Sequence, residues 1–183
     1  MLFSNLLSSS STIRLMPKKS HARGHGTRNL SMPLNRCFAC GPANPEGMHL
    51  MFYFDEPRRR AWCHFKLARR YQGPPGHAHG GIIATILDEA MGKVNKLRHV
   101  VALTSRMQVE YLRPVPLGQT LIAEGRESSV RGRRHTNLAE IKNHKGDVLA
   151  RGRGLFIAVD AEKMFAKHIR KNERTGPLAN AKR

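Results

Sequence analysis

The chain has 183 residues, which is enough for one domain with tails, and its 40% hydrophobic content suffices to build a core. Its formal net charge is +19, but residues 1–36 contain six basic and no acidic side chains, and residues 161–183 contain seven basic and two acidic ones. More than half of the excess charge therefore lies in flanking segments, which favours solvated tails over a nucleic-acid-binding surface. No apolar run reaches the ~18 residues of a membrane span, so we expect no membrane partner.

The first segment, residues 1–33, is rich in serine and arginine and contains no acidic residue. This composition suits a disordered basic extension that is either an organelle transit peptide or an upstream start codon misread as the beginning, with Met16 or Met32 as the true start. Three cysteines indicate no disulfide framework and favour a reducing compartment. We therefore expect a cytoplasmic protein, or a mitochondrial one if residues 1–31 are a transit peptide.

The ordered domain is predicted to span residues 34–160 and to begin with a turn-rich loop, CFACGPANPEG, at residues 37–47. Two short strands are predicted at residues 49–54 and 61–67. The segment QGPPGHA, at residues 72–78, is predicted to be a rigid loop, because its prolines lack the N–H donors that a helix or a central strand needs.

One helix is predicted over about residues 80–98, where apolar side chains occupy most of the circumference of the first three turns and so indicate a buried central helix. Four strand-like runs follow with short breaks, which we expect to pair antiparallel as a four-strand meander. The predicted fold class is α+β, with one curved antiparallel sheet wrapped around the long helix. Residues 161–183 are predicted to form a short basic helix and a disordered C-terminal tail.

Two carboxylates lie inside this apolar helix, although the whole chain has only 13 acidic residues. A carboxylate on an apolar surface loses hydration, so it usually has a partner or a function. Glu89 precedes Lys93 by four residues, which is the favourable order for a helical ion pair. Asp88 instead has the small residues Ala84 and Gly92 one turn away on either side, which leave room for a substrate. We interpret Glu89 as a structural acid and Asp88 as the candidate catalytic acid.

Three segments make the chain resemble the PaaI-like acyl-CoA thioesterases, a family with the hot-dog fold. These segments are CFACGPANPEGMHL, YQGPPGHAHGGIIATILDEAMG and LTSRMQVEYLRPVPLGQ. The resemblance covers about residues 34–160 and implies hydrolysis of acyl-CoA by a homodimer or a dimer of dimers, without a metal or other cofactor. It also implies that Asp88 is the catalytic carboxylate, that Thr104 positions this carboxylate or its water, and that His79 belongs to the HGG signature.

Two glycines open the predicted helix, at the end where backbone N–H groups lack helical acceptors and the helix dipole is positive. Because Gly80 has no side chain, a thioester carbonyl can approach its amide, which makes it a candidate oxyanion donor, with Gly81 as a substrate-binding position. The alternative is that these glycines only allow tight packing. Asp88 lies about 12 Å further along the helix axis. Both groups can therefore act on one thioester only if they come from antiparallel helices of two subunits.

Three assignments stay open. Thr104 either positions the catalytic group or was selected for strand propensity. His79 either hydrogen-bonds near the thioester or has a structural role. Many relatives carry an asparagine seven residues before the first helix glycine, where this chain has Gly73, so Gln72 is a candidate substitute for binding the substrate.

The cysteines and the reaction type also allow alternatives. Cys37 and Cys40 have the spacing of zinc ligands, but a structural site needs four ligands, and Cys63 and His64 are adjacent strand residues on opposite faces, so we predict no metal site. Asp88 acts either as a general base on water or as a nucleophile. Rival functions are a non-catalytic acyl-CoA-binding regulatory hot-dog protein, a hydratase acting on enoyl thioesters, and a basic nucleic-acid-binding protein.

Overall fold

The computed structural model describes residues 35–166. The predicted N-terminal extension and most of the predicted basic tail lie outside the described residues, although residues 161–166 are helical. Within the described range, no helix combines the length and the apolar character that crossing a bilayer requires.

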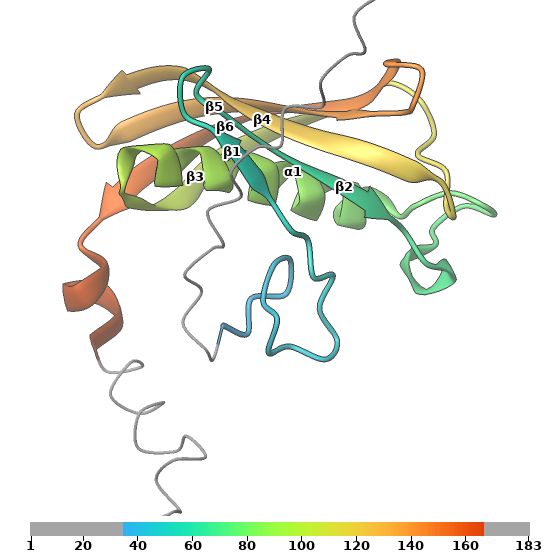
Figure 1. Cartoon of the computed structure of the whole chain (residues 1–183), viewed down its shortest axis with the longest axis horizontal. Coiled ribbons are helices and arrows are strands. Elements are labelled where there is room, and N and C mark those ends of the chain that lie inside the picture. The colour runs from blue at the N-terminus through green and yellow to red at the C-terminus, as the bar shows by residue number, and fades with distance from the viewer. Residues whose placement is uncertain (1–34, 167–183) are drawn as a thin grey trace, which may run out of the picture.

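Six strands form one antiparallel sheet, and the helix α1 (Gly80–Asn95) lies along one of its faces (Figure 1). The short 3-10 helices are η1 (Arg69–Tyr71) and η2 (Lys96–Arg98), and η2 directly continues α1. The strands are β1 (Tyr53–Asp55), β2 (Arg60–Lys66), β3 (Val101–Tyr111), β4 (Thr120–Arg131), β5 (Arg134–Lys142) and β6 (Val148–Val159). The predicted α+β class and the central helix over residues 80–98 are confirmed.

The order of the strands across the sheet is β1-β2-β4-β5-β6-β3. The predicted four-strand meander is therefore wrong, because β3 pairs with β6 and not with β4. The cause is the segment at residues 112–119, which is not a hairpin turn. Its Val115 carbonyl accepts the Ala78 N–H at 2.9 Å, and its Leu117 N–H donates to the Gly76 carbonyl at 3.0 Å. These bonds attach the connection to the proline-rich loop, so the chain crosses from one edge of the sheet to the opposite half.

The helix packs so closely on the sheet that its backbone touches β4. A Cβ atom added at Gly125 would lie 2.1 Å from the Ala90 carbonyl oxygen, so only glycine fits there. The apolar side chains that α1 turns toward the strands are Ile83, Ile86, Leu87, Ala90, Met91 and Val94, all of them buried. This breadth of burial is what the sequence pattern predicted for a central helix.

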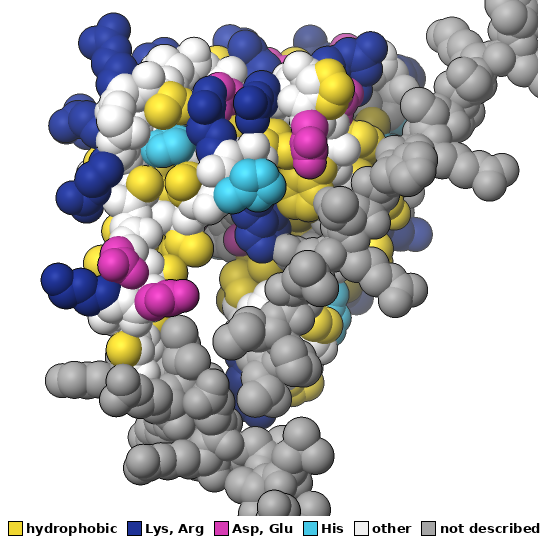
Figure 2. Space-filling model, turned by 60° about the vertical axis from the view of Figure 1, so that its left-hand side comes forward, with side chains coloured by type: hydrophobic (Ala, Val, Ile, Leu, Met, Phe, Trp, Pro, Cys, Tyr) yellow, Lys and Arg dark blue, Asp and Glu magenta, His cyan; other side chains and the backbone are white. Residues whose placement is uncertain are grey.

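One face of the molecule shows how basic side chains are distributed over part of its surface. Figure 2 shows one face on which Lys and Arg side chains stand apart from one another, with acidic side chains and exposed hydrophobic atoms between them. A duplex or a single strand would be expected to meet a continuous basic stripe. The surface in this view does not have that form.

Candidate functional site

The site is built around the carboxylate of Asp88, which lies half-buried in the middle of α1. The hydroxyl of Thr104, on β3, donates a hydrogen bond to Asp88 Oδ1 at 2.7 Å. No described residue donates a hydrogen bond to the other carboxylate oxygen, Oδ2. The structure thus brings together two of the residues that the sequence analysis singled out, and it leaves one carboxylate oxygen available for a substrate or a water.

A β-bulge in β3 explains why Thr104 reaches the helix. Thr104 pairs with Phe156 and Arg106 pairs with Leu155, so Ser105 is an extra residue without an opposite partner. Alternation without the bulge would place Thr104 on the same face as Arg106, away from Met107, which packs on the core. Because of the bulge, Thr104 instead lies on the same face as Met107 and points toward α1. Bulges are often found beside active sites for this reason.

The environment of Asp88 changes its acidity. Burial raises the pKa of this carboxyl above its ordinary value, because the charged form loses hydration. The hydrogen bond from Thr104 lowers the pKa by stabilising the charged form, and the nearby charge of Glu89 raises it again. The net direction is upward, so Asp88 is a stronger base than a solvated aspartate.

The N-terminus of α1 presents one available amide. His79 is the N-cap, and its imidazole Nδ1 accepts the Gly81 N–H at 3.0 Å. The His79 carbonyl accepts the N–H groups of Ile82 and Ile83, the two residues after Gly81. Within residues 35–166, the Gly80 N–H has no acceptor. His79 therefore has a capping role in this structure, and Gly80, not Gly81, keeps a donor free for a ligand.

Tyr111 is a residue of this region that the sequence analysis missed. Its hydroxyl, at the end of β3, donates to the Gly80 carbonyl at 3.1 Å, and its ring lies 3.6 Å from where a Cβ of Gly80 would be. This contact joins the end of β3 to the start of α1 and fixes the peptide beside the free amide. The two residues are 31 positions apart, so no local sequence pattern indicates the contact.

Gln72 and Gly73 belong to the loop that precedes the helix. The Gln72 side-chain oxygen accepts the Gly76 N–H at 3.2 Å, so in this structure its amide stabilises the loop. A Cβ at Gly73 would lie 2.8 Å from the Cα of His79. An asparagine at this position would therefore require the backbone before α1 to shift, which is a structural reason for the glycine.

Glu89 has the structural partner that the sequence predicted. Its Oε1 lies 2.9 Å from the Nζ of Lys93, whose side chain is 4% exposed. Because the Lys93 ammonium already pairs with Glu89, this acid is less suited than Asp88 to take part in a reaction at the helix surface.

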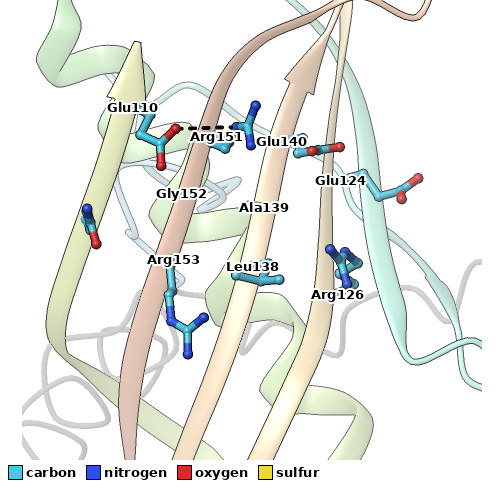
Figure 3. A pocket seen from close by; sticks show the side chains of 10 residues that line it. Glu110, Glu124, Arg126, Leu138, Ala139, Glu140, Arg151, Gly152 and Arg153 are labelled. Atoms are coloured by element: carbon cyan, nitrogen blue, oxygen red, sulfur yellow. Dashed lines mark ion pairs between the residues drawn. The ribbon is translucent and has the colours of Figure 1, made fainter. Parts of the chain in front are cut away.

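A shallow hollow lies on the opposite face of the sheet from α1 (Figure 3). Side chains from β3, β4, β5 and β6 line it, and Arg151 and Glu110 form an ion pair across it at 3.6 Å. Both of these side chains are about half exposed, so solvent screens the pair. None of the predicted site residues lines this hollow, and it is separate from the site around Asp88.

Comparison with known proteins agrees with the fold. Residues 75–150 match the sequence profile of the Thioesterase superfamily. Acyl-coenzyme A thioesterase THEM4 of Xenopus laevis is 30% identical over 103 residues, and the match covers 56% of this chain and 46% of that protein. The chain thus spans about half the length of the curated relatives it matches.

Solved structures show the same architecture. The crystal structure of a thioesterase superfamily protein is 31% identical and has a TM-score of 0.64, with 67% of this chain and 60% of that chain covered. The PaaI protein from the phenylacetic acid degradation operon of E. coli has a TM-score of 0.53 at 20% identity, with 56% and 75% covered, and so supports the fold alone. The described part of this chain has the hot-dog fold, and its residues 75–150 are similar in sequence to the Thioesterase superfamily.

Proposed function

We propose that the chain hydrolyses acyl-CoA thioesters to a free carboxylic acid and coenzyme A. The observation that carries the proposal is a half-buried carboxylate, Asp88, on an otherwise apolar helix, with one oxygen held by Thr104 and the other without a donor. The substrate class is taken from the name of the Xenopus relative. The residues that match the Thioesterase superfamily, 75–150, include Asp88 and Thr104.

Asp88 acts as the base or as the nucleophile. Its raised pKa makes the carboxylate a better proton acceptor, and Oδ2 is the oxygen that can take a proton from water or attack the thioester carbon directly. Thr104 keeps the carboxylate in one orientation during this step. The thiolate of coenzyme A is a good leaving group, so the reaction needs no strong general acid.

The Gly80 amide stabilises the negative charge that develops on the thioester oxygen. It is a free N–H at the positive end of a 16-residue helix, and it is not covered by a side chain of its own. His79 contributes by capping Gly81, which leaves the Gly80 amide as the donor that faces the ligand. Gly81 and Gln72 then shape the loop next to the substrate.

The two groups come from different subunits. They are eight residues apart on one helix, which corresponds to about 12 Å, and this is too far for both to contact one thioester. The strand β3 is at the edge of the sheet, and it leaves Val101, Leu103 and Tyr111 between 43% and 55% exposed. An exposed edge with apolar side chains favours pairing with a second strand. A homodimer joined along β3 therefore gives two composite sites, each with Gly80 of one subunit and Asp88 of the other.

Subunit complementation tests this arrangement. Asp88→Asn and Gly80→Pro are expected to be inactive alone, measured as release of free thiol from a panel of acyl-CoA substrates. In a heterodimer of the two variants one site contains both substitutions and the other contains neither. Co-expression with different tags should therefore give about a quarter of the wild-type activity from a statistical mixture, and about half from purified heterodimers.

Two results would contradict the proposal. If the mixture were as inactive as each variant alone, sites shared between subunits would be excluded. Full activity of Asp88→Asn would exclude a catalytic role for the Asp88 carboxylate. Saturable binding of acyl-CoA without thiol release by the wild-type chain would identify the regulatory alternative instead.

A further inference from the structure

A second cluster of reactive groups lies between the loop before β1 and the helix α1. The ammonium of Lys93 donates to Cys40 Sγ at 3.0 Å and lies 2.9 Å from Glu89 Oε1. Cys37 Sγ lies 3.9 Å from Glu89 Oε2. The two sulfurs and the Glu89 carboxylate all lie within 4.8 Å of one another. The mechanism proposed above uses none of these four side chains.

A tight turn holds the two cysteines together. The Gly41 N–H donates to the Cys37 carbonyl at 2.8 Å, and a Cβ at Gly41 would lie 2.4 Å from the Cys37 nitrogen. Only glycine fits after the second cysteine, so the turn brings both sulfurs to the same side. Cys37 is exposed and Cys40 is half-buried, which gives the pair one accessible and one protected sulfur.

The charges around the pair differ at the two sulfurs. A hydrogen bond from Cys40 is the main cause that lowers the pKa of Cys37 to about 6, although burial opposes it. The hydrogen bond with Cys37, burial and the charge of Glu89 raise the pKa of Cys40, and they outweigh the hydrogen bond from Lys93, which lowers it. Burial lowers the pKa of Lys93, but Glu89 and Cys40 outweigh it, so the ammonium keeps its charge at neutral pH. An accessible thiolate beside a protonated second thiol is the arrangement found in disulfide-exchanging CxxC pairs.

We propose that Cys37 and Cys40 form a dithiol that exchanges with small-molecule disulfides and closes reversibly to an intramolecular disulfide. The Cys37 thiolate attacks one sulfur of the disulfide, whose S–S bond breaks, and one thiolate leaves. Cys40 then gives its proton to Glu89 and attacks the Cys37 sulfur, which releases the second thiolate. The two cysteines are oxidised and the small disulfide is reduced to one thiol and one thiolate. The Cys40 proton, passed on through Glu89, protonates one of the two released thiolates, and the other carries the negative charge that the Cys37 thiolate brought to the reaction.

A zinc site would use the same residues, but two observations argue against it. Cys37, Cys40 and Glu89 are three ligands, and within the described chain no fourth His, Cys, Asp or Glu joins them, whereas a structural zinc site uses four. Moreover, the Lys93 ammonium already contacts Cys40 and Glu89, so a second cation there would be repelled.

Oxidation of the full chain with glutathione disulfide tests the proposal. Trypsin places Cys37 and Cys40 in one peptide, residues 37–58, and Cys63 in another, residues 61–66. Alkylation after oxidation should leave both cysteines of the first peptide unmodified, with the mass of that peptide reduced by two hydrogen atoms. Dithiothreitol should restore both thiols. Cys63, which is fully buried, serves as the internal control and should stay a thiol when the protein is denatured and alkylated.

Single variants separate the roles of the two sulfurs. In Cys40→Ser, glutathione should accumulate as a stable adduct on Cys37, because the attacking second sulfur is gone. In Cys37→Ser, adduct formation should be at least tenfold slower, since the remaining thiol is protonated and shielded. Cys63→Ala should react like the wild type.

The rate at which Cys37 is alkylated supplies a second measurement that does not depend on disulfide formation. It should level off above about pH 7, whereas an ordinary thiol continues to gain rate to about pH 8.5. Two thiols that remain alkylatable in excess glutathione disulfide would overturn the proposal. So would one zinc ion per chain released when these thiols are modified, which would assign the cluster to a metal.

Discussion

Replacing Gly80 by proline removes the proposed oxyanion donor and leaves the helix intact. Proline is favoured at the first position of a helix, because the N–H that it lacks has no helical acceptor there. The preceding residue, His79, has φ −65° and ψ 140°, which is the backbone region that a residue before proline prefers. The nearest side chain, the ring of Tyr111, lies 3.6 Å from the Cβ position, which is an ordinary contact. The free energy of unfolding should therefore change by less than about 1 kcal/mol.

The activity should respond much more strongly. Loss of one oxyanion donor costs about 3–4 kcal/mol of transition-state stabilisation, so kcat for thiol release should fall about 10²–10³-fold with a smaller change in KM. Gly80→Ala is the matched control, because it adds a methyl group and keeps the N–H. A stable Gly80→Pro variant with the kcat of the wild type would refute the role of this amide. Gly80→Ala should lose less activity than Gly80→Pro, because its methyl group narrows the approach but its N–H remains. A variant that unfolds in urea at much lower concentration would instead refute the reasoning on the helix start.

Further predictions concern the acid, the ion pair and the helix-to-sheet contact. Thr104→Val removes the bond that lowers the pKa of Asp88, so the pKa should rise further, kcat should fall about tenfold, and the acid limb of the pH–rate profile should move to higher pH. Thr104→Ser keeps the hydroxyl, so kcat and the pH–rate profile should stay as in the wild type. An unchanged pH–rate profile in Thr104→Val would exclude the positioning role of Thr104. Lys93→Met leaves Glu89 half-buried without its partner, so the free energy of unfolding in urea should fall by about 3 kcal/mol. Substituting both residues by methionine should recover much of this stability. An unchanged free energy of unfolding in Lys93→Met would contradict a buried ion pair. Gly125→Ala forces the helix off β4 and should cost about 3 kcal/mol, so equal stability would show that the layers can separate freely.

The parts of the fold that depend on local pattern could be predicted. The breadth of the apolar surface on α1 identified a buried helix, and the four-residue spacing identified the Glu89–Lys93 pair, which left Asp88 as the acid without a partner. The strand segments were also recognisable, except that the first pairs only over Tyr53–Asp55. His49, in the predicted first strand, has a φ of 53°, which takes the chain out of the extended conformation at that point.

The parts that depend on long-range pairing could not be predicted. Strand alternation does not reveal that the connection at residues 112–119 fastens to the proline-rich loop, so the partner of β3 was assigned wrongly. Alternation also does not reveal the extra residue at Ser105, without which Thr104 would point away from Asp88. The contacts of Cys37 and Cys40 with α1 join residues 52 and 53 positions apart. Such contacts arise from how the loop before β1 folds back, and they leave no periodic signal.

Because the proposed dimer forms along the exposed edge of β3, the activity per chain should depend on the protein concentration. On the proposed arrangement a lone chain has a carboxylate and a donor that serve different bonds, so turnover per chain should fall on dilution as pairs dissociate. The outer edge of β3, with Val101 and Leu103 exposed, would then be open to pairing with exposed strands of other proteins. Dilution would therefore both lower the activity and expose the chain to aggregation. An acyl-CoA that binds across two chains should counter both effects.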